Sequence, residues 1–251
     1  MKNTILIKAG GDVLASYRKR MALLETISQL AKKYHIVFVH GGKSQINSDM
    51  KTLNKKAKFI NGQRYTDEET LKTVESSLSH LNHQIVCELN NLNVKAVGIC
   101  GIDGKMFEIQ RIKKLGLVGR IKSVNPDLIL SLLKENYLPV ISPISAGKRI
   151  LNVNADYVAG TLASALKCKK LIFISDVPGI LDEKGKTIKE IRMKDFDKLK
   201  KQNIIKTGMI PKVSNCYSAL KEGVKEIYIT NKVDFISKGK LNLCGTKITL
   251  S

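Results

Sequence analysis

The sequence predicts an α/β protein, a three-layer αβα sandwich around an open, mainly parallel central sheet. Short apolar segments rich in β-branched residues alternate along the chain with longer amphipathic segments. Most of the apolar segments end at glycine, aspartate or another polar turn residue. Such alternation gives parallel strands joined by helices, with right-handed crossovers that cover both faces of the sheet.

The strands of this sheet are expected where β-branched and apolar residues run together for about five residues. Buried strands are predicted at residues 4–7, 36–39, 96–99, 138–142, 171–175 and 226–230. Ligands of open α/β sheets bind at the carboxyl ends of the strands, so the turns after these segments are the first places to search for a site.

Helices are expected between the strands, where apolar residues recur at helical spacing and the opposite face is polar. They are predicted at residues 22–34, 67–92, 126–136, 155–166 and 211–222. Pro126 and Pro211 suit the first turn of a helix, where a missing N–H is tolerated.

The length of 251 residues with 43% hydrophobic content allows one large core or two modest lobes. We expect a single domain with a soft division near residues 142–148, giving an N-terminal lobe of about residues 1–145 and a C-terminal lobe of about residues 146–251.

The composition argues against a membrane protein and against a disulfide-rich or metal-binding protein. No apolar run of about eighteen residues and no N-terminal leader is seen, so we expect a soluble, cytoplasmic protein with no membrane partner. The five scattered cysteines form no Cys-x-x-Cys pair, which favours reduced, mostly buried thiols over disulfides or a metal site.

The net charge of +21 favours anionic ligands or an acidic partner. Of the 43 basic residues 36 are lysines spread along the whole chain, and arginine and aromatic residues are scarce. This pattern does not favour nucleic-acid binding, for which base-reading arginines and stacking aromatics are typical. Codon bias toward A and T explains the lysine content as well as selection for charge does.

Two glycine pairs follow the first two predicted strands: Gly10 and Gly11 after Lys8, and Gly41 and Gly42 after the second strand. Paired glycines allow backbone N–H groups to approach an anion closely, although a single pair after a strand is more often a simple turn. A lysine in an apolar strand needs an anionic partner, which strengthens the functional interpretation.

Three polar residues at alternate positions, Asn152, Asn154 and Asp156, would share one face of an extended segment. Taken alone, Asp156 is better explained as the cap of the following helix, and the residues around it decide between the two roles. Lys212 stands at a predicted helix start, where the macrodipole disfavours a cation unless it faces a negative group. A carboxylate between Lys8 and Lys212 would direct both ammonium groups toward a transferring phosphoryl group.

These motifs resemble the amino acid kinase family, most closely its members that phosphorylate N-acetylglutamate. The resemblance covers about residues 4–249, and its markers stand in family order. They are IKAGG at 7–11, VHGG at 39–42, NGQRYTD at 61–67, AVG at 96–98, LVG at 117–119, NVNAD at 152–156, SDVPGIL at 175–181 and GMIPKV at 208–213.

The resemblance implies an N-terminal lobe that binds the acidic substrate and dimerises, and a C-terminal lobe that binds ATP with Mg²⁺, without a protein-bound metal site. The implied product is the acyl phosphate of N-acetyl-L-glutamate, the second step of arginine (ornithine) biosynthesis. The implied catalytic residues are Lys8, Lys212 and Asp156; the substrate residues are Gly41, Gly42, Arg64, Asn152 and Asn154; the phosphate and nucleotide residues are Gly10, Gly11, Asp176, Gly179, Ile180, Leu181, Lys206 and Gly208.

Lys43 departs from the family pattern, because the related kinases usually carry a third glycine there. A related branch that phosphorylates glutamate or aminoadipate on an acidic amino-group carrier protein tolerates a side chain at this place, and a basic surface would suit such a carrier. Thr207 and residues 230–234 also depart, with smaller expected effects on the nucleotide.

A third alternative is a non-catalytic basic binding or regulatory protein on a kinase scaffold, since fold alone does not fix function. Arginine-inhibited family members carry an extra N-terminal helix that joins dimers into hexamers. With no residues before the first predicted strand to build that helix, we expect a homodimer that arginine does not inhibit.

Overall fold

A computed structural model describes residues 2–202, 204–205, 210–236 and 240–250 of the chain. Its centre is an eight-stranded sheet in the order β12-β16-β13-β11-β1-β2-β8-β5, in which every neighbouring pair is parallel except β13 and β16. The strands are β1 (Thr4–Ala9), β2 (His35–His40), β5 (Ala96–Cys100), β8 (Leu138–Ser142), β11 (Lys170–Ile174), β12 (Glu190–Arg192), β13 (Glu226–Thr230) and β16 (Thr246–Thr249).

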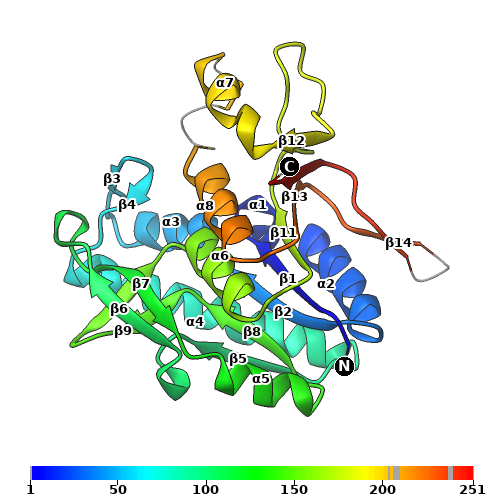
Figure 1. Ribbon diagram of the computed structural model, residues 1–251. Helices are drawn as coiled ribbons and strands as arrows, with labels where there is room; N and C mark the ends of the chain where they lie inside the picture. Colours follow the sequence, from blue (N-terminus) through cyan, green and yellow to red (C-terminus); the bar gives the residue numbers. More distant parts are fainter. Residues whose placement is uncertain (1, 203, 206–209, 237–239, 251) are drawn as a thin grey trace.

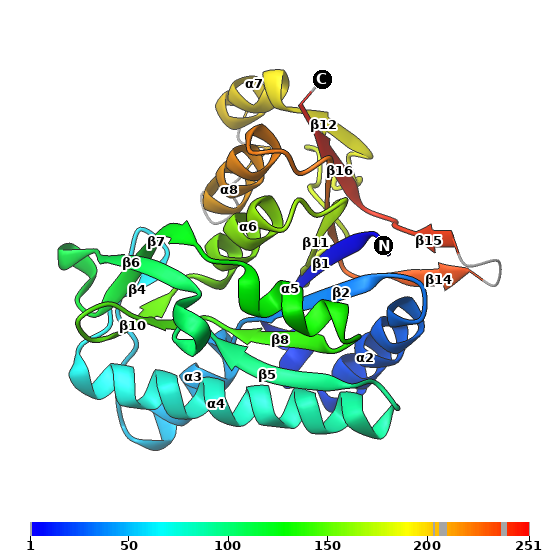
Figure 2. The same cartoon turned by 60° about the horizontal axis from the view of Figure 1, so that its bottom comes forward.

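Helices cover both faces of this sheet, and Figures 1 and 2 show α2 and α4 on one side and α6 and α8 on the other. The helices are α1 (Asp12–Ala15), α2 (Tyr17–Ala31), α3 (Lys43–Thr52), α4 (Glu68–Asn91), α5 (Asp127–Lys134), α6 (Ala155–Ala165), α7 (Phe196–Lys201) and α8 (Ile210–Lys221). The predicted αβα sandwich is therefore confirmed.

Alternate residues of the central strands supply two hydrophobic cores, one on each face. Leu6 and Val37 pack with α5, α6 and α8, whereas Ile5, Ile7 and Phe38 pack with α2 and α4. Each fully buried leucine or isoleucine contributes about 2 kcal/mol. Because both cores extend across β1, β2 and β11, the two halves of the sheet share their packing.

A second, four-stranded sheet has the order β6-β7-β10-β9. Its strands are β6 (Phe107–Arg111), β7 (Val118–Val124), β9 (Ile144–Ala146) and β10 (Ile150–Val153). Two hairpins complete the fold, β3 (Phe59–Ile60) with β4 (Gln63–Arg64), and β14 (Asp234–Ile236) with β15 (Lys240–Asn242). None of these strands is predicted from the sequence, although motif residues such as Arg64 and Asn152 lie in them.

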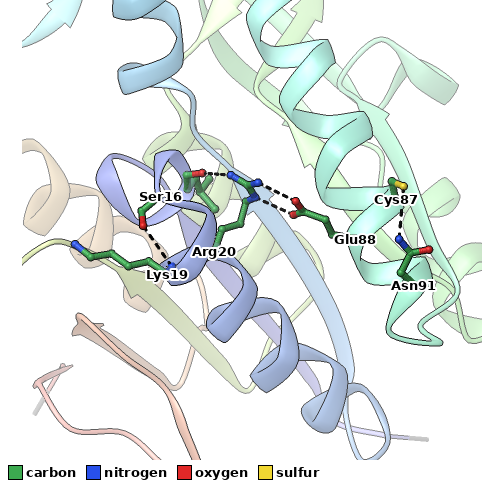
Figure 3. Close-up of polar contacts among 7 residues, drawn as sticks. Ser16, Lys19, Arg20, Cys87, Glu88 and Asn91 are labelled. Atoms are coloured by element: carbon green, nitrogen blue, oxygen red, sulfur yellow. Dashed lines mark hydrogen bonds and ion pairs between the residues drawn. The ribbon is translucent and has the colours of Figure 1, made fainter.

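A buried ion pair ties the first helices to α4. Arg20 on α2 donates two hydrogen bonds of 2.8 Å to the carboxylate of Glu88 on α4, and Figure 3 shows the two planar groups facing each other. A third guanidinium N–H donates to the carbonyl of Leu14 at 2.6 Å. Arg20 thereby fixes α1, which follows the Gly10-Gly11 turn directly, against the long helix.

The chain builds the sheet on one side of β1 first and on the other side afterwards. The strand order therefore reverses beside β1, at a topological switch point. From β1 the chain passes to β2 and later to β5 and β8 on one side, and it returns to build β11, β13 and β16 on the other. Ligands of open α/β sheets bind at such points, beyond the carboxyl ends of the strands.

The cysteine expectation was wrong in part. Cys168 and Cys216 are buried, but Cys87 and Cys244 are exposed and Cys100 is intermediate. The two buried thiols lie against the central sheet, whereas Cys87 lies on the solvent side of α4.

Candidate active site

A cavity of about 250 Å³ opens at the carboxyl ends of β1 and β2, where the switch point predicts a ligand. Turns after β1, β2 and β10 meet there with the β3–β4 hairpin. Ten residues singled out from the sequence line it: Lys8, Gly10, Gly11, Gly41, Gly42, Lys43, Arg64, Asn152, Asn154 and Asp156. The remaining wall is largely apolar, formed by Ile46, Phe59, Leu78, Val118, Pro143 and Val153.

The glycine turns are closely packed, most tightly at Gly11 and Gly42. A Cβ at Gly10 would lie 3.1 Å from Lys8 Nζ and 3.7 Å from Gly41 Cα, and a Cβ at Gly42 would lie 2.6 Å from Leu78 Cδ2. Gly11 has φ +61°, and a Cβ there would lie 2.9 Å from a carboxylate oxygen of Asp176. These turns bring backbone and the Lys8 ammonium to one wall of the cavity.

Asp156 lies between the two lysines. Its Oδ1 is 2.8 Å from Lys8 Nζ and its Oδ2 is 3.8 Å from Lys212 Nζ, and all three side chains are less than one-fifth exposed. Burial alone raises the pKa of Asp156, but the two ammonium groups outweigh it and hold the pKa below its ordinary value. The carboxylate is therefore ionised and carries one negative charge against two positive charges.

Lys212 is the third residue of α8 and also lies over the Phe173 ring, 5.6 Å from its centroid. Burial lowers its pKa, and the neighbouring Lys8 lowers it further, while Asp156 acts in the opposite direction. The two lysines and Asp156 together carry one net positive charge beside the cavity, which suits an anion with several negative charges.

The position of Asp156 follows from a helix cap. Strand β10 ends at Val153, and the Asn154 side chain accepts hydrogen bonds from the backbone N–H groups of Asp156 and Tyr157 at 2.9 and 3.1 Å. Asn154, not Asp156, therefore caps α6, and the interpretation of Asp156 as a helix cap was wrong. Its carboxylate is consequently free to face the lysines from the first turn.

Arg64 also lines the cavity and is only 8% exposed. Its guanidinium donates to Asn47 Oδ1 at 2.5 Å and stacks 4.9 Å from the Phe59 ring centroid. Burial lowers its pKa, although an arginine remains charged at any physiological pH. No carboxylate of the described residues forms an ion pair with it, so its charge is available to a ligand.

Asn152, at the end of β10, donates to Thr66 Oγ1 at 3.2 Å. Its amide is thereby oriented beside the β4 end, and the cavity is lined by polar groups on two sides and apolar groups between them. The expected extended segment reaches Asn154, whose backbone is still extended, but it does not include Asp156, because α6 begins at Ala155.

His40 was not assigned a role from the sequence, although it stands within the VHGG motif. It is fully buried, its Nε2 accepts from Asn82 Nδ2 at 3.0 Å, and its Nδ1 lies 3.3 Å from the carbonyl oxygen of Gly41. Burial lowers the pKa of His40 to about 4. A neutral imidazole therefore packs beneath the second glycine turn. The sequence feature that could have indicated this buried role is a histidine at the end of an apolar strand.

Four of the expected nucleotide residues, Asp176, Gly179, Ile180 and Leu181, follow β11 and are not among the residues that line this cavity. Asp176 faces Gly11 across the switch point, and the Ile180 backbone N–H donates to Thr246 Oγ1 at 2.8 Å while its side chain is buried in the core. Gly179 has φ +158°, and a Cβ there would lie 2.7 Å from side-chain atoms of Thr187 and Thr246. Leu181 forms an isolated antiparallel β-bridge with Thr187. Lys206 and Gly208 lie outside the described residues.

Comparisons with known proteins agree with this geometry. The model of the amino acid kinase family matches residues 3–231. A protein of Clostridium kluyveri named acetylglutamate kinase is 40% identical over 236 residues, covering 90% of this chain and 83% of that protein. A protein of the same name from Endomicrobium trichonymphae is 37% identical, covering 96% and 98%.

Among solved structures, smu.665 from Streptococcus mutans UA159 superposes with a TM-score of 0.87 at 28% identity, covering all of both chains. Within the described residues, no helix is long and apolar enough to cross a membrane, and no group of histidine, cysteine, aspartate or glutamate side chains is arranged to hold a metal ion.

Proposed function

The chain belongs to the amino acid kinase family, and from this premise we propose that it phosphorylates the side-chain carboxylate of N-acetyl-L-glutamate with ATP. The related proteins named acetylglutamate kinase support this substrate. The observation that carries the proposal is the Lys8–Asp156–Lys212 set, whose Lys8 and Asp156 line the same cavity as Arg64. The reaction belongs to arginine biosynthesis.

The chemistry requires positioning and charge more than proton transfer. A carboxylate oxygen of the substrate attacks the γ-phosphorus of ATP in line, the bond to the bridging oxygen breaks, and ADP leaves with its electron pair. The substrate carboxylate is already ionised at neutral pH, so no general base is needed. Lys8 and Lys212 stabilise the charge on the transferring group, and Asp156 holds both ammonium groups in place.

ATP enters as its magnesium complex, so the metal is part of the substrate. The close glycine turns and the two buried lysines fit a polyphosphate, because they offer backbone N–H groups and net positive charge. We assign Gly10 and Gly11 to the phosphates, and Asp176, Gly179, Ile180, Leu181, Lys206 and Gly208 to the nucleotide.

On the substrate side we assign Arg64 to the carboxylate that does not react, because a guanidinium binds carboxylates in bidentate geometry. Gly41, Gly42, Asn152 and Asn154 contribute polar contacts, and the apolar wall accommodates the methylene and acetyl groups. A homodimer is part of the proposal, and light scattering that gives the mass of one chain, or of more than two, would contradict it.

The test is trapping of the acyl phosphate with hydroxylamine, using the purified protein, Mg-ATP and N-acetylglutamate. Glutamate, aspartate and N-acetylaminoadipate serve as comparisons. Hydroxamate formed from N-acetylglutamate in preference to the other acids is expected. No hydroxamate from N-acetylglutamate would contradict the proposal.

One second candidate has a specific observation in its favour. The side chain of Lys43 at the cavity and the charge of +21 suit glutamate or aminoadipate carried by an acidic protein. A purified acidic carrier protein loaded with glutamate, added to the same assay, distinguishes this substrate from the free acid. ATP turnover absent with every acid, together with salt-sensitive binding to an acidic partner, would instead indicate a non-catalytic role.

A further inference from the structure

Lys43 occupies a position that the proposed reaction does not yet use. It is the first residue of α3, its side chain lines the cavity, and Gly42 before it makes no side-chain cap. A lysine at the start of a helix is disfavoured by the macrodipole unless an anion lies nearby. Within the described part of the chain, no carboxylate forms an ion pair with Lys43.

A second cation lies on the same aromatic ring. Lys43 Nζ is 5.5 Å from the centroid of Phe59, and the Arg64 guanidinium carbon is 4.9 Å from that centroid. The ring attracts both cations but neutralises neither. Lys43 is exposed, so water screens part of its repulsion from the buried Arg64, and an anion that binds beside both cations would gain from the two charges together.

The cavity is also lined by a second charged set. Lys8 and Asp156 line it and form an ion pair, and Lys212 lies 3.8 Å from the same carboxylate, so the positive charge near the cavity comes from Lys8 and Lys212 as well as from Lys43 and Arg64. N-acetylglutamate has two carboxylates joined by a short chain, and only one of them is phosphorylated. The two sets of cations therefore suit a dianionic substrate, with one carboxylate beside each set.

We propose that Lys43 is a ligand of the substrate's non-reacting carboxylate, which it binds together with Arg64 at the Phe59 side of the cavity. This inference rests on the proposed function and assigns a specificity-determining residue to it. Lys43 selects acids that carry a second carboxylate, and it acts on binding of the acid, with no part in phosphoryl transfer.

The test replaces the charge and keeps the length of the side chain, in Lys43→Met. The matched control is Lys51→Met, which removes the same charge from an exposed position in the last turn of the same helix. We expect Lys43→Met to raise KM for N-acetylglutamate by about five- to tenfold, with kcat and KM for ATP within about twofold. Lys51→Met should leave all three constants within about twofold.

A substrate analogue isolates the carboxylate itself. For N-acetylglutamate whose α-carboxylate is replaced by a carboxamide, KM should be the same within about twofold in the wild type and in Lys43→Met. The rise of KM with ionic strength should also be weaker in that variant, because one screened charge is missing.

Lys43→Gly tests whether charge or bulk matters. A KM that rises as in Lys43→Met supports the inference, and a KM that falls would overturn it, because the side chain would then obstruct the site. An unchanged KM for N-acetylglutamate in Lys43→Met, or a changed KM for ATP instead, would also overturn the inference. Turnover of N-acetylglutamate by the wild type would still support the proposed kinase activity in that case. If the wild type does not phosphorylate N-acetylglutamate, the proposed function fails and the inference fails with it.

Discussion

Asp156 is the residue on which the site depends most directly. It neutralises half of the charge of Lys8 and Lys212 and is 2.8 and 3.8 Å from their ammonium groups. A carboxylate with a lowered pKa favours the native state above its unfolded pKa, and this contribution is lost as pH falls through the folded pKa. Its role at neutral pH is therefore that of a permanent anion.

Asp156→Asn should lower kcat by about 100-fold or more, because the lysines lose the group that directs them at the phosphoryl group. Steady-state kinetics with Mg-ATP and N-acetylglutamate provide the measurement. The control is circular dichroism of the variant, which should match the wild type. A kcat within about fivefold of the wild type would mean that Asp156 has no part in catalysis.

His40 makes stability depend on pH in a window set by its environment. Its pKa is lowered from 6.5 to about 4 by burial, so the unfolded chain binds a proton between those values and the native state does not. Stability therefore rises with pH across this window. The effect of this one group is on the order of 3 kcal/mol.

His40→Gln should lower stability but remove most of that dependence. Urea unfolding of both proteins at pH 5 and pH 7.5 measures it. The difference in unfolding free energy between the two pH values should be smaller in the variant. An equal difference in both proteins would show that His40 is not the group responsible.

At the scale of elements, the junction of β10 and α6 sets the geometry of the site. Asn154 caps α6, and Asp156 follows in the first turn. Asn154→Ala should destabilise the protein by about 1 kcal/mol and also lower kcat, since the first turn is no longer fixed. Asn154→Ser keeps a capping oxygen and should recover most of the stability, as measured by thermal unfolding. Equal losses in both variants would indicate that the cap is unimportant.

The central strands and the larger helices could be predicted because their sequence patterns are local. Leu138–Ser142 and Glu226–Thr230 have the predicted bounds, and the helix expected at 155–166 is α6 within one residue. Helix α2 begins at Tyr17, five residues earlier than expected, because its polar first turns are stabilised by a contact with another helix. Arg20 pairs there with Glu88, which is 68 residues away and not visible in any local pattern.

The same limit applies to the second sheet and the site. Strands β9 and β10 are only three and four residues long, and β6 and β7 carry several polar and charged side chains, so none shows the apolar pattern of a buried strand. The parallel pairing of β7 with β10 joins segments that are far apart along the chain. For the site, the sequence predicted the set of cavity residues from motif order, but not which asparagine caps α6. The proximity of Phe59 to Lys43 and Arg64 could not be predicted from the sequence, because it arises where the β3–β4 hairpin packs on α3.

The whole molecule shares its hydrophobic cores across the proposed lobe boundary. One core joins Leu6 and Val37 of the N-terminal half to Leu171 and Ile227 of the C-terminal half. We therefore expect one cooperative unfolding transition, although a chain of 251 residues exceeds the usual two-state size. Far-ultraviolet circular dichroism and tyrosine fluorescence should give coincident urea curves. Two separated transitions would show that the lobes are independent folding units.

The uneven burial of the cysteines has a practical consequence. Burial raises the pKa of Cys168 to about 12 and also raises the pKa of Cys216, so neither thiol presents a reactive thiolate near neutral pH. Cys87 on α4 and Cys244 beside β16 are exposed. Maleimide dyes will therefore attach to these two sites without mutagenesis. Energy transfer between them can report how far α4 and the β16 end of the sheet move when nucleotide and acid bind.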